Sequence, residues 1–460
     1  MNHLGVKFPI RNVPMLDPNF VPIQRFNEAF LQTAKQPFSI ALTRNGDQVA
    51  VCNTFVHGTA HMHAADLVYI DRFIKTLLWM KGGYRLSLCG DAWLCAEIQK
   101  AYTPHGTRAF DVGFMSRVYE CPFEVARVDS LPQAHDVSAP IGRHLDGCRI
   151  GFDAGGSDRK VSAVIDGNPV FSEEVVWYPK LNSDPAYHYE GIVSAFKAAA
   201  SHMPRVDAIG ISSAGVFIDN RTMVASLFLK VPEPLFNQQI KDIYLRAAKE
   251  IGDVPVSVCN DGDVTALAGA MSLEENNVLG VAMGTSEAAG FVDASGNITG
   301  WLNELAFAPV DLNSRAMRDE WSNDIGCGVK YFSQDGVIKL AESAGINLVQ
   351  AASPAEKLKV VQKLAESGDL AAKHVFSDIG IYLGHTLPFY YALYGFSDIL
   401  LLGRVMSGVG GDLICSFANK VLLDEYPDVA KAITLRLPDE NSRRVGQSVA
   451  AASLPELRTH

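Results

Sequence analysis

A glycine turn between two alternating segments constrains the fold of this chain more than any other feature. The segments 150–154 and 161–165 alternate apolar residues with small or polar ones, and Asp153 lies near the end of the first. This period of two predicts a pair of β-strands joined by a tight turn, with backbone N–H groups that face outward. The residues of the turn are Gly155, Gly156 and Ser157.

A carboxylate at a strand end beside such a turn suits a metal-bound polyphosphate. The N–H groups and hydroxyls can hold phosphate oxygens, and the carboxylate of Asp153 can orient Mg²⁺ through water. The structural alternative is an ordinary hairpin with an Asp at its turn. The pattern occurs again at 280–296, where the turn consists of Gly284, Thr285 and Ser286. Two copies of one turn predict two similar lobes that face each other across a cleft.

Composition narrows the class of protein. With 460 residues, 48% of them hydrophobic and 20% charged, the chain has the composition of a globular protein of two or three domains. The net charge of −11 argues against nonspecific binding to nucleic acid or to an anionic membrane. No signal peptide and no run of apolar residues long enough to span a membrane is found. The eight cysteines contain no CxxC pair, which predicts free thiols and a cytoplasmic protein.

A polar segment with two prolines, at 129–140, predicts a boundary between two parts of the chain. Residues 1–140 are expected to form a packed α+β extension of their own, which docks beside the cleft or forms an oligomer contact. Its strands and helices are predicted at 37–56 (a hairpin), 64–78 (a helix), 84–89 (a strand) and 92–101 (a helix).

The remainder alternates strands and helices, which predicts mixed sheets covered by helices. Strands are predicted at 148–154, 160–166, 206–212, 254–259, 277–283, 288–293 and 398–402. Helices are predicted at 189–202, 235–251, 262–271, 335–344, 355–366, 369–395, 410–424 and 441–452.

Several motifs, taken in order, resemble those of a known superfamily. The turn that follows Asp153 resembles the first phosphate motif of the sugar kinase/hexokinase/actin superfamily, and the turn at 284–286 resembles the second. The segment 400–411 resembles the adenosine motif, with Arg404 at the place of its second glycine. Within the superfamily, the match is closest to the ROK family of sugar kinases. The segments that carry this match are 208–219, 258–261 and 303–311.

The resemblance implies a fold and an activity. The expected fold class is α/β, with two ribonuclease H-like lobes of the hexokinase/actin type around a cleft, in addition to the N-terminal extension. The lobes are expected at 141–255 and 256–460, and the C-terminal helix can pack back on the first lobe. The implied activity is that of an ATP-dependent carbohydrate kinase, which uses Mg²⁺ to transfer the γ-phosphoryl group to a sugar hydroxyl. A homodimer is expected, with a sugar or polyol substrate and no nucleic-acid or membrane partner.

Roles follow residue by residue from the matched motifs. Asp261 is expected to act as the base that accepts the hydroxyl proton, whereas the structural alternative is a helix N-cap. Asp153 is expected to hold Mg²⁺ through water. The sugar is expected to contact Ser213, Ala214, Gly215, Asn260, Asp261 and Glu304. The nucleotide is expected to contact Asp153, Gly155, Gly156, Ser157, Gly284, Thr285, Ser286, Gly403 and Arg404.

Two departures from the family pattern affect the expected ligands. Phe307 stands where the family has a histidine that contacts sugar and zinc, and Cys327 alone remains of a cysteine cluster. A structural zinc site needs four N or S ligands, so no zinc is expected. Two alternatives stay open, namely a non-catalytic ROK-like sugar sensor and a kinase for a polyol, a cyclitol or another small metabolite. The lack of a basic helix-turn-helix pattern argues against a DNA-binding repressor.

Overall fold

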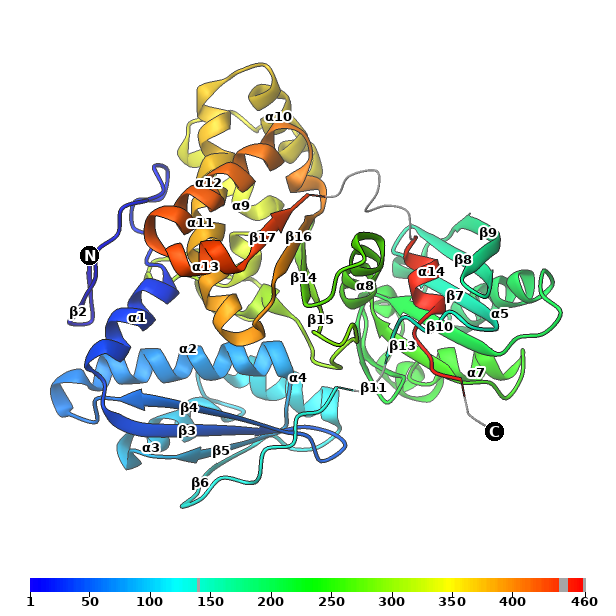
Figure 1. Ribbon diagram of the computed structural model, residues 1–460, viewed down its shortest axis with the longest axis horizontal. Coiled ribbons are helices and arrows are strands. Elements are labelled where there is room, and N and C mark those ends of the chain that lie inside the picture. Colours follow the sequence, from blue (N-terminus) through cyan, green and yellow to red (C-terminus); the bar gives the residue numbers. More distant parts are fainter. Residues whose placement is uncertain (139–140, 438–445, 458–460) are drawn as a thin grey trace.

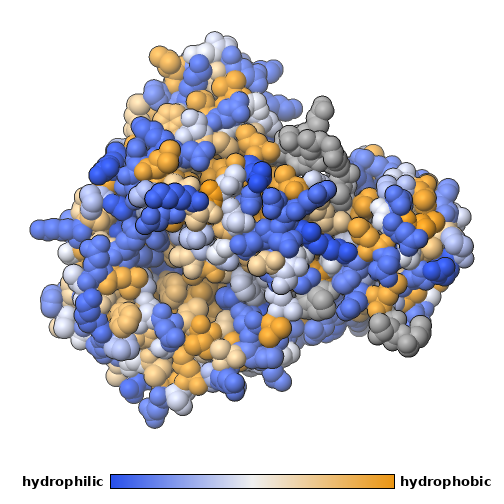
Figure 2. Space-filling model, viewed as in Figure 1, coloured by the Kyte–Doolittle hydropathy of each residue, from blue (hydrophilic) through white to orange (hydrophobic). Residues whose placement is uncertain are grey.

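The computed structural model describes residues 1–138, 141–437 and 446–457. Three parts are visible in Figure 1, an N-terminal module below, a first lobe at the right and a second lobe above. Hydrophobic and hydrophilic residues are interspersed over the face shown in Figure 2. Within the described ranges, none of the helices combines the length and the apolar character that crossing a bilayer requires.

The N-terminal module is built on a sheet with strand order β4-β3-β5-β6. Gly46 has a φ of +64° at the turn between β3 and β4, as an Asn-Gly hairpin requires. The long helix α2 lies between this sheet and the second lobe (Figure 1). The elements of the module are β1 (Asn2–His3), β2 (Val6–Lys7), α1 (Ile23–Thr33), β3 (Gln36–Thr43), β4 (Val49–Val56), η1 (Ala60–Met62), α2 (His63–Lys81), β5 (Arg85–Cys89), α3 (Ala92–Ala101), α4 (Ala109–Tyr119) and β6 (Glu124–Arg127).

The first lobe has a mixed sheet with order β13-β10-β7-β8-β9, in which β13, β10 and β7 are parallel. Its elements are β7 (Cys148–Ala154), β8 (Asp158–Ile165), β9 (Asn168–Val176), η2 (Pro179–Leu181), α5 (Pro185–Ala200), β10 (Ala208–Ser213), β11 (Val216–Ile218), β12 (Arg221–Val224), η3 (Ser226–Phe228), α6 (Glu233–Leu235), the π-helix η4 (Phe236–Ile240), α7 (Ile243–Lys249) and β13 (Val256–Asn260).

The C-terminal helix α14 (Gln447–Ala452) returns to this sheet. Gly151 on β7 and Gly210 on β10 are paired in register. A Cβ atom on Gly151 would lie 1.7 Å from the Ser448 carbonyl oxygen, and one on Gly210 equally close to that of Ala451. Only glycine therefore allows α14 to approach the sheet at these two positions.

The second lobe repeats the mixed pattern with strand order β15-β14-β16-β17. Its first helix, α8, lies between the two lobes (Figure 1) and shares a hydrophobic cluster with α14 and β14. The elements are α8 (Asp261–Leu273), β14 (Val278–Met283), β15 (Glu287–Val292), η5 (Leu305–Phe307), η6 (Gly328–Lys330), α9 (Gln334–Ser343), α10 (Pro354–Glu366), α11 (Leu370–Tyr394), β16 (Asp398–Leu402), η7 (Arg404–Met406), α12 (Val409–Glu425), α13 (Pro427–Ala432) and β17 (Thr434–Arg436).

The hydrophobic core of the N-terminal module is continuous with that of the second lobe. One hydrophobic cluster runs from its sheet and α2 into the second lobe. The ring of Phe307 packs on Trp79 of α2 at 4.3 Å between centroids and on Phe110 at 5.5 Å. The polar segment at 129–140 therefore separates the module from the first lobe along the chain, while burial of aromatic rings joins the module to the second lobe.

A cluster of ion pairs also holds the N-terminal module on the second lobe. Asp324, in the segment where the family has its cysteine cluster, lies 2.6 Å from Arg72, 2.7 Å from Arg108 and 3.4 Å from Lys75. Burial opposes its ionisation, but the charges of Arg72, Arg108 and Lys75 outweigh burial and hold the pKa of Asp324 well below its usual value. Phe307 and Asp324 thus both attach the module to the second lobe.

The module also contacts the first lobe, through α4 and the strands β11 and β12. Val216 of β11 belongs to the same hydrophobic cluster as the module. Glu120, at the end of α4, pairs with Arg221 at 2.9 Å and with Lys241 at 2.6 Å. Asn45 donates a hydrogen bond to Asp219 at 3.3 Å.

Most predicted elements exist, and the errors have local causes. The helix predicted at 235–251 is broken into α6, η4 and α7, because the chain passes through a π-helix at Phe236–Ile240. The helix predicted at 441–452 is described only from residue 447 onward, and its earlier part lies outside the described residues. Strands β9 and β17 and helices α1 and α4 were not predicted from the sequence.

Candidate functional site

Asp153 lies near the end of β7, where its carboxylate accepts a hydrogen bond from the Ser212 hydroxyl at 2.9 Å. Burial raises the pKa of Asp153 to about 6, and the charge of Asp261 contributes, while the bond from Ser212 acts in the opposite direction. The Gln447 side chain of α14 donates to the Ser212 hydroxyl at 3.0 Å and to the Asp261 carbonyl at 3.2 Å. The C-terminal helix therefore holds both strand ends in place.

Asp261 is the first residue of α8, directly after β13. The cap of this helix is Asn260, whose side chain accepts from the Gly262 N–H at 2.7 Å and donates to the Gly215 carbonyl at 2.8 Å. Asp261 is therefore not needed as the N-cap. Burial raises the pKa of its carboxyl above the usual value, although the Gly262 N–H and the charge of Lys180 oppose that shift.

Glu304 lies in the second lobe, directly before η5. Its backbone N–H donates to the Trp79 carbonyl at 2.9 Å, so α2 of the N-terminal module fixes its position. Burial raises the pKa of Glu304 to about 7, and the charges of Asp261 and Asp263 add to that shift.

Two further carboxyl groups at the site were not expected. Asp263 accepts from Asn303 at 2.8 Å and from the Phe291 N–H at 3.2 Å, and burial raises its pKa to about 7. Glu287 on β15 is 3% exposed, and neither of its oxygens has a hydrogen-bond partner among the described residues. Burial and the charge of Glu304 raise the pKa of Glu287 to about 8, so it is mostly protonated near neutral pH. Glu287 lies directly before the strand predicted at 288–293, and the structure extends that strand to include it.

The first glycine turn is held by Trp177, whose indole N–H donates to the Gly155 carbonyl at 2.8 Å. Gly156 and Ser157 are exposed at the tip of the turn. A Cβ atom on Gly156 would lie 3.3 Å from the Lys180 ammonium nitrogen. Lys180 therefore brings positive charge both to this turn and to Asp261, a role that nothing in its sequence context indicated.

The second turn and the adenosine-like motif lie against each other. The Gly284 carbonyl accepts from the N–H of Gln334 at 2.9 Å, while Thr285 and Ser286 are exposed. Gly403 has a φ of +93°, and a Cβ atom on it would lie 2.3 Å from the Met283 carbonyl oxygen, so only glycine fits. The adjacent Arg404 is exposed, and its backbone carbonyl accepts from Gln362 at 2.7 Å.

The segment 213–215 borders Asn260 in the neighbouring strand. The Ser213 hydroxyl is buried and accepts from Tyr244 at 2.7 Å, so it faces the core of the first lobe rather than a ligand. Ala214 is half-buried. Gly215 has a φ of +149° and leaves room for the Val224 carbonyl, which a Cβ atom would approach to 2.4 Å.

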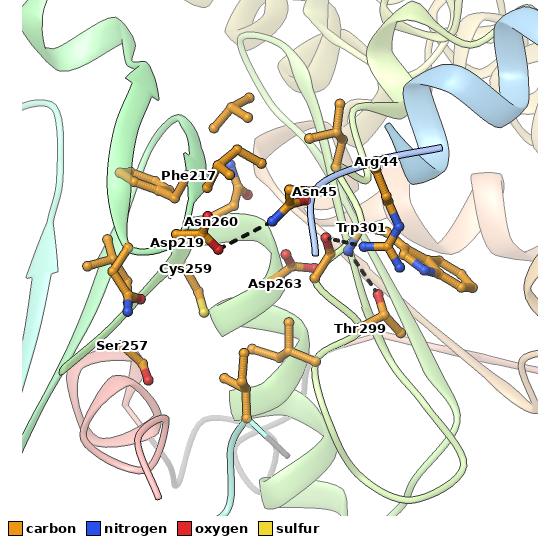
Figure 3. Close-up of a pocket in the computed structure, with 18 of the residues that line it drawn as sticks. Arg44, Asn45, Phe217, Asp219, Ser257, Cys259, Asn260, Asp263, Thr299 and Trp301 are labelled. Atoms are coloured by element: carbon orange, nitrogen blue, oxygen red, sulfur yellow. Dashed lines mark hydrogen bonds between the residues drawn. The ribbon is translucent and has the colours of Figure 1, made fainter. Parts of the chain in front are cut away.

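A pocket of about 360 Å³ opens beside Asn260, at the junction of the three parts of the protein (Figure 3). Gly215 and Asn260 line it from the first lobe, Asp263 and Trp301 from the second, and Arg44 from the N-terminal module. Figure 3 shows Asn45 of the module reaching across to Asp219 of the first lobe. The module thus forms a wall of the site rather than lying away from it.

The residues present fit the groups that the motifs imply. Burial raises the pKa of Asp153, and repulsion by Asp261 adds to that shift; a divalent cation held through water would relieve the repulsion. Exposed hydroxyls and N–H groups at both glycine turns suit phosphate oxygens. The thiol of Cys327 is buried. No group of three or more His, Cys, Asp or Glu residues in the described ranges is arranged to hold a metal ion.

Comparison with solved structures identifies the fold. A ROK hexokinase from Thermus thermophilus matches with a TM-score of 0.51 at 18% identity, over 66% of this chain and 96% of that one. The chain has the ROK fold. A ROK family transcriptional regulator, a homologue of the E. coli MLC protein, matches with a TM-score of 0.50 at 16% identity, over 67% of this chain and 79% of that one.

The same comparisons leave a third of this chain without a counterpart in the ROK hexokinase, a share similar in size to the N-terminal module. The expected fold class, an ROK-type pair of lobes with an extension, is confirmed. No family model and no curated protein matches the sequence. Because the ROK fold occurs in a hexokinase and in a transcriptional regulator, the fold by itself does not decide between catalysis and sensing.

Proposed function

We propose that this protein is an ATP-dependent kinase that phosphorylates a hydroxyl group of a carbohydrate. The observation that carries the proposal is the position of Asp261. Asp261 directly follows the end of β13, Asn260 caps helix α8 in its place, and the charge of Asp261 adds to the effect of burial in raising the pKa of Glu304. A buried carboxylate with a raised pKa suits a general base better than an exposed one.

In the proposed reaction, Asp261 accepts the proton of the acceptor hydroxyl as that oxygen attacks the γ-phosphorus of ATP. Asn260 and Glu304 hold neighbouring hydroxyls, since an amide both donates and accepts and a carboxylate accepts. Thr285 and Ser286 donate to the phosphate oxygens, and Lys180 offsets negative charge near the first turn. Magnesium bound with ATP neutralises charge on the transferred phosphoryl group.

The first experiment is a panel of sugars and polyols, screened for ADP release with ATP and Mg²⁺. The second is the variant Asp261→Asn, assayed on the best acceptor. Asn keeps the shape and can still accept from the Gly262 N–H, but it cannot take a proton. We expect kcat to fall by roughly 10²–10⁴-fold, the usual effect of losing a general base, with little change in KM for ATP.

A sugar sensor of the regulator type is the rival proposal, and the same experiments separate the two. A sensor would bind a sugar in calorimetry without releasing ADP, and Asp261→Asn would then change affinity only. A kcat within threefold of the wild-type value for the folded variant would remove Asp261 from the mechanism.

A further inference from the structure

The pocket beside Asn260 is separate from the proposed catalytic carboxylates. Asn260 and Asp263 line it together with Arg44 and Asn45 of the N-terminal module. Asp261 and Glu304 are not among the described residues that line it. A sugar ring that binds beside Asp261 for phosphorylation would therefore leave this pocket empty and would border it at Asn260.

The charges on the walls exclude strongly charged ligands. Arg44 is ion-paired with Asp136, and Lys81 shares the same carboxylate at 2.7 Å. Asp219 and Asp263 line the pocket as well. An anion would face these two carboxyl groups, and a cation would face Arg44, so an uncharged ligand fits best.

The polar atoms on the walls point to a ligand rich in hydroxyl groups. Asn45 and Asn260 line the pocket with amide groups, which both donate and accept hydrogen bonds. Ser257 and Thr299 also line the pocket with hydroxyl-bearing side chains, and Phe217 adds an aromatic ring. Neutral donors and acceptors beside one apolar face match the two kinds of surface on a sugar ring.

We propose that the acceptor is a saccharide of more than one ring. The ring to be phosphorylated lies at Asp261 and Glu304, and a second, uncharged ring lies in the pocket against Arg44 and Asn45. This inference rests on the proposed function, and it assigns the N-terminal module a role in acceptor specificity.

The test compares hexoses with disaccharides that carry the same hexose at their non-reducing end, using kcat/KM for each. We expect at least one disaccharide, among maltose, cellobiose and lactose, to exceed its hexose by tenfold or more. If every hexose is used at least as well as its disaccharides, this proposal is overturned and the kinase function stands. If no saccharide supports ADP release, the proposed function itself fails.

A matched pair of variants tests where the second ring lies. Gly46 lines the pocket with a φ of +64° and no atom within 4 Å of a Cβ position. Asn tolerates that backbone conformation, so Gly46→Asn fills the space without displacing a neighbour. The control is Gly345→Asn, because Gly345 has a φ of +75° and equally open space but lies outside the pocket.

We expect Gly46→Asn to lower the ratio of disaccharide to hexose kcat/KM at least tenfold and Gly345→Asn to leave that ratio unchanged. An unchanged ratio in folded Gly46→Asn would refute the placement of the second ring.

Discussion

Replacing Asp324 by Asn tests how the N-terminal module is held on the second lobe. The carboxylate of Asp324 meets Arg72, Lys75 and Arg108, all of which come from the module. Asn preserves the volume, and its oxygen can still accept from the Ile325 N–H, as Asp324 does at 2.9 Å. The substitution therefore removes one negative charge and little else.

The loss of folding free energy in Asp324→Asn depends on which of the three cations keep another carboxylate partner. Lys75 retains Asp111 at 2.8 Å, and Arg108 retains Asp71. Arg72, whose side chain is 13% exposed, pairs only with Asp324 among the ion pairs of the described residues. Removing one partner of a buried pair costs about 3–5 kcal/mol. Because a single cation is left unpaired, we expect the lower end, about 3 kcal/mol.

Urea unfolding followed by tryptophan fluorescence measures this loss, since Trp79 on α2 is buried beside the cluster. With a slope of about 3 kcal/mol per M, the midpoint should fall by about 1 M. The control is Glu124→Gln, which breaks the exposed pair with Arg85 and should cost less than about 1 kcal/mol. Equal midpoint shifts in the two variants would refute the role assigned to Asp324.

The effect of pH on the same measurement has a definite sign. The folded-state pKa of Asp324 lies well below its usual value, because the three cations outweigh the effect of burial. Its contribution to stability is therefore complete above the unfolded pKa of about 3.9 and is lost as the pH falls below that value. The difference between wild type and Asp324→Asn should be constant from pH 8 to pH 5 and shrink only in stronger acid.

Three further predictions concern activity, the module and zinc. Because burial raises the pKa of Asp261, kcat/KM should decline on the acid side at a higher pH than an ordinary aspartate would cause, and a rate that stays flat down to pH 4 would contradict a base at this position. A chain that begins at Asp146 would expose the apolar surface around Phe307, so we expect aggregation in size-exclusion chromatography; a monodisperse, stable product would refute the shared core. Elemental analysis should find no stoichiometric zinc, and one zinc per chain, lost together with activity on chelation, would overturn that expectation.

Local patterns in the sequence predicted much of the architecture. Alternation on both sides of Asp153, and again around the 284–286 turn, predicted the two strand pairs because period-two burial is a property of each strand alone. The position of Asp261, after a buried strand and before a helix, could also be predicted from its neighbouring residues alone. The motif order then indicated the ROK fold, which the comparison with solved structures confirmed.

What the sequence could not show depends on contacts between distant segments. Lys180 and Gln447 have no local signal, and they join the site only because the loop after β9 and the helix α14 return to the ends of β7 and β13. Glu287 acquires a raised pKa only inside the packed second lobe.

The sequence by itself determined the two glycine turns, the strands around them and the place of Asp261 along the chain, since these features depend on neighbouring residues. The tertiary structure alone decided that Phe307 contacts Trp79 and that Arg44 lines a pocket beside Asn260. The physical reason is that an apolar or polar side chain gains free energy from whichever surface removes it from water or satisfies its hydrogen bonds. That surface exists only after the N-terminal module and both lobes have packed.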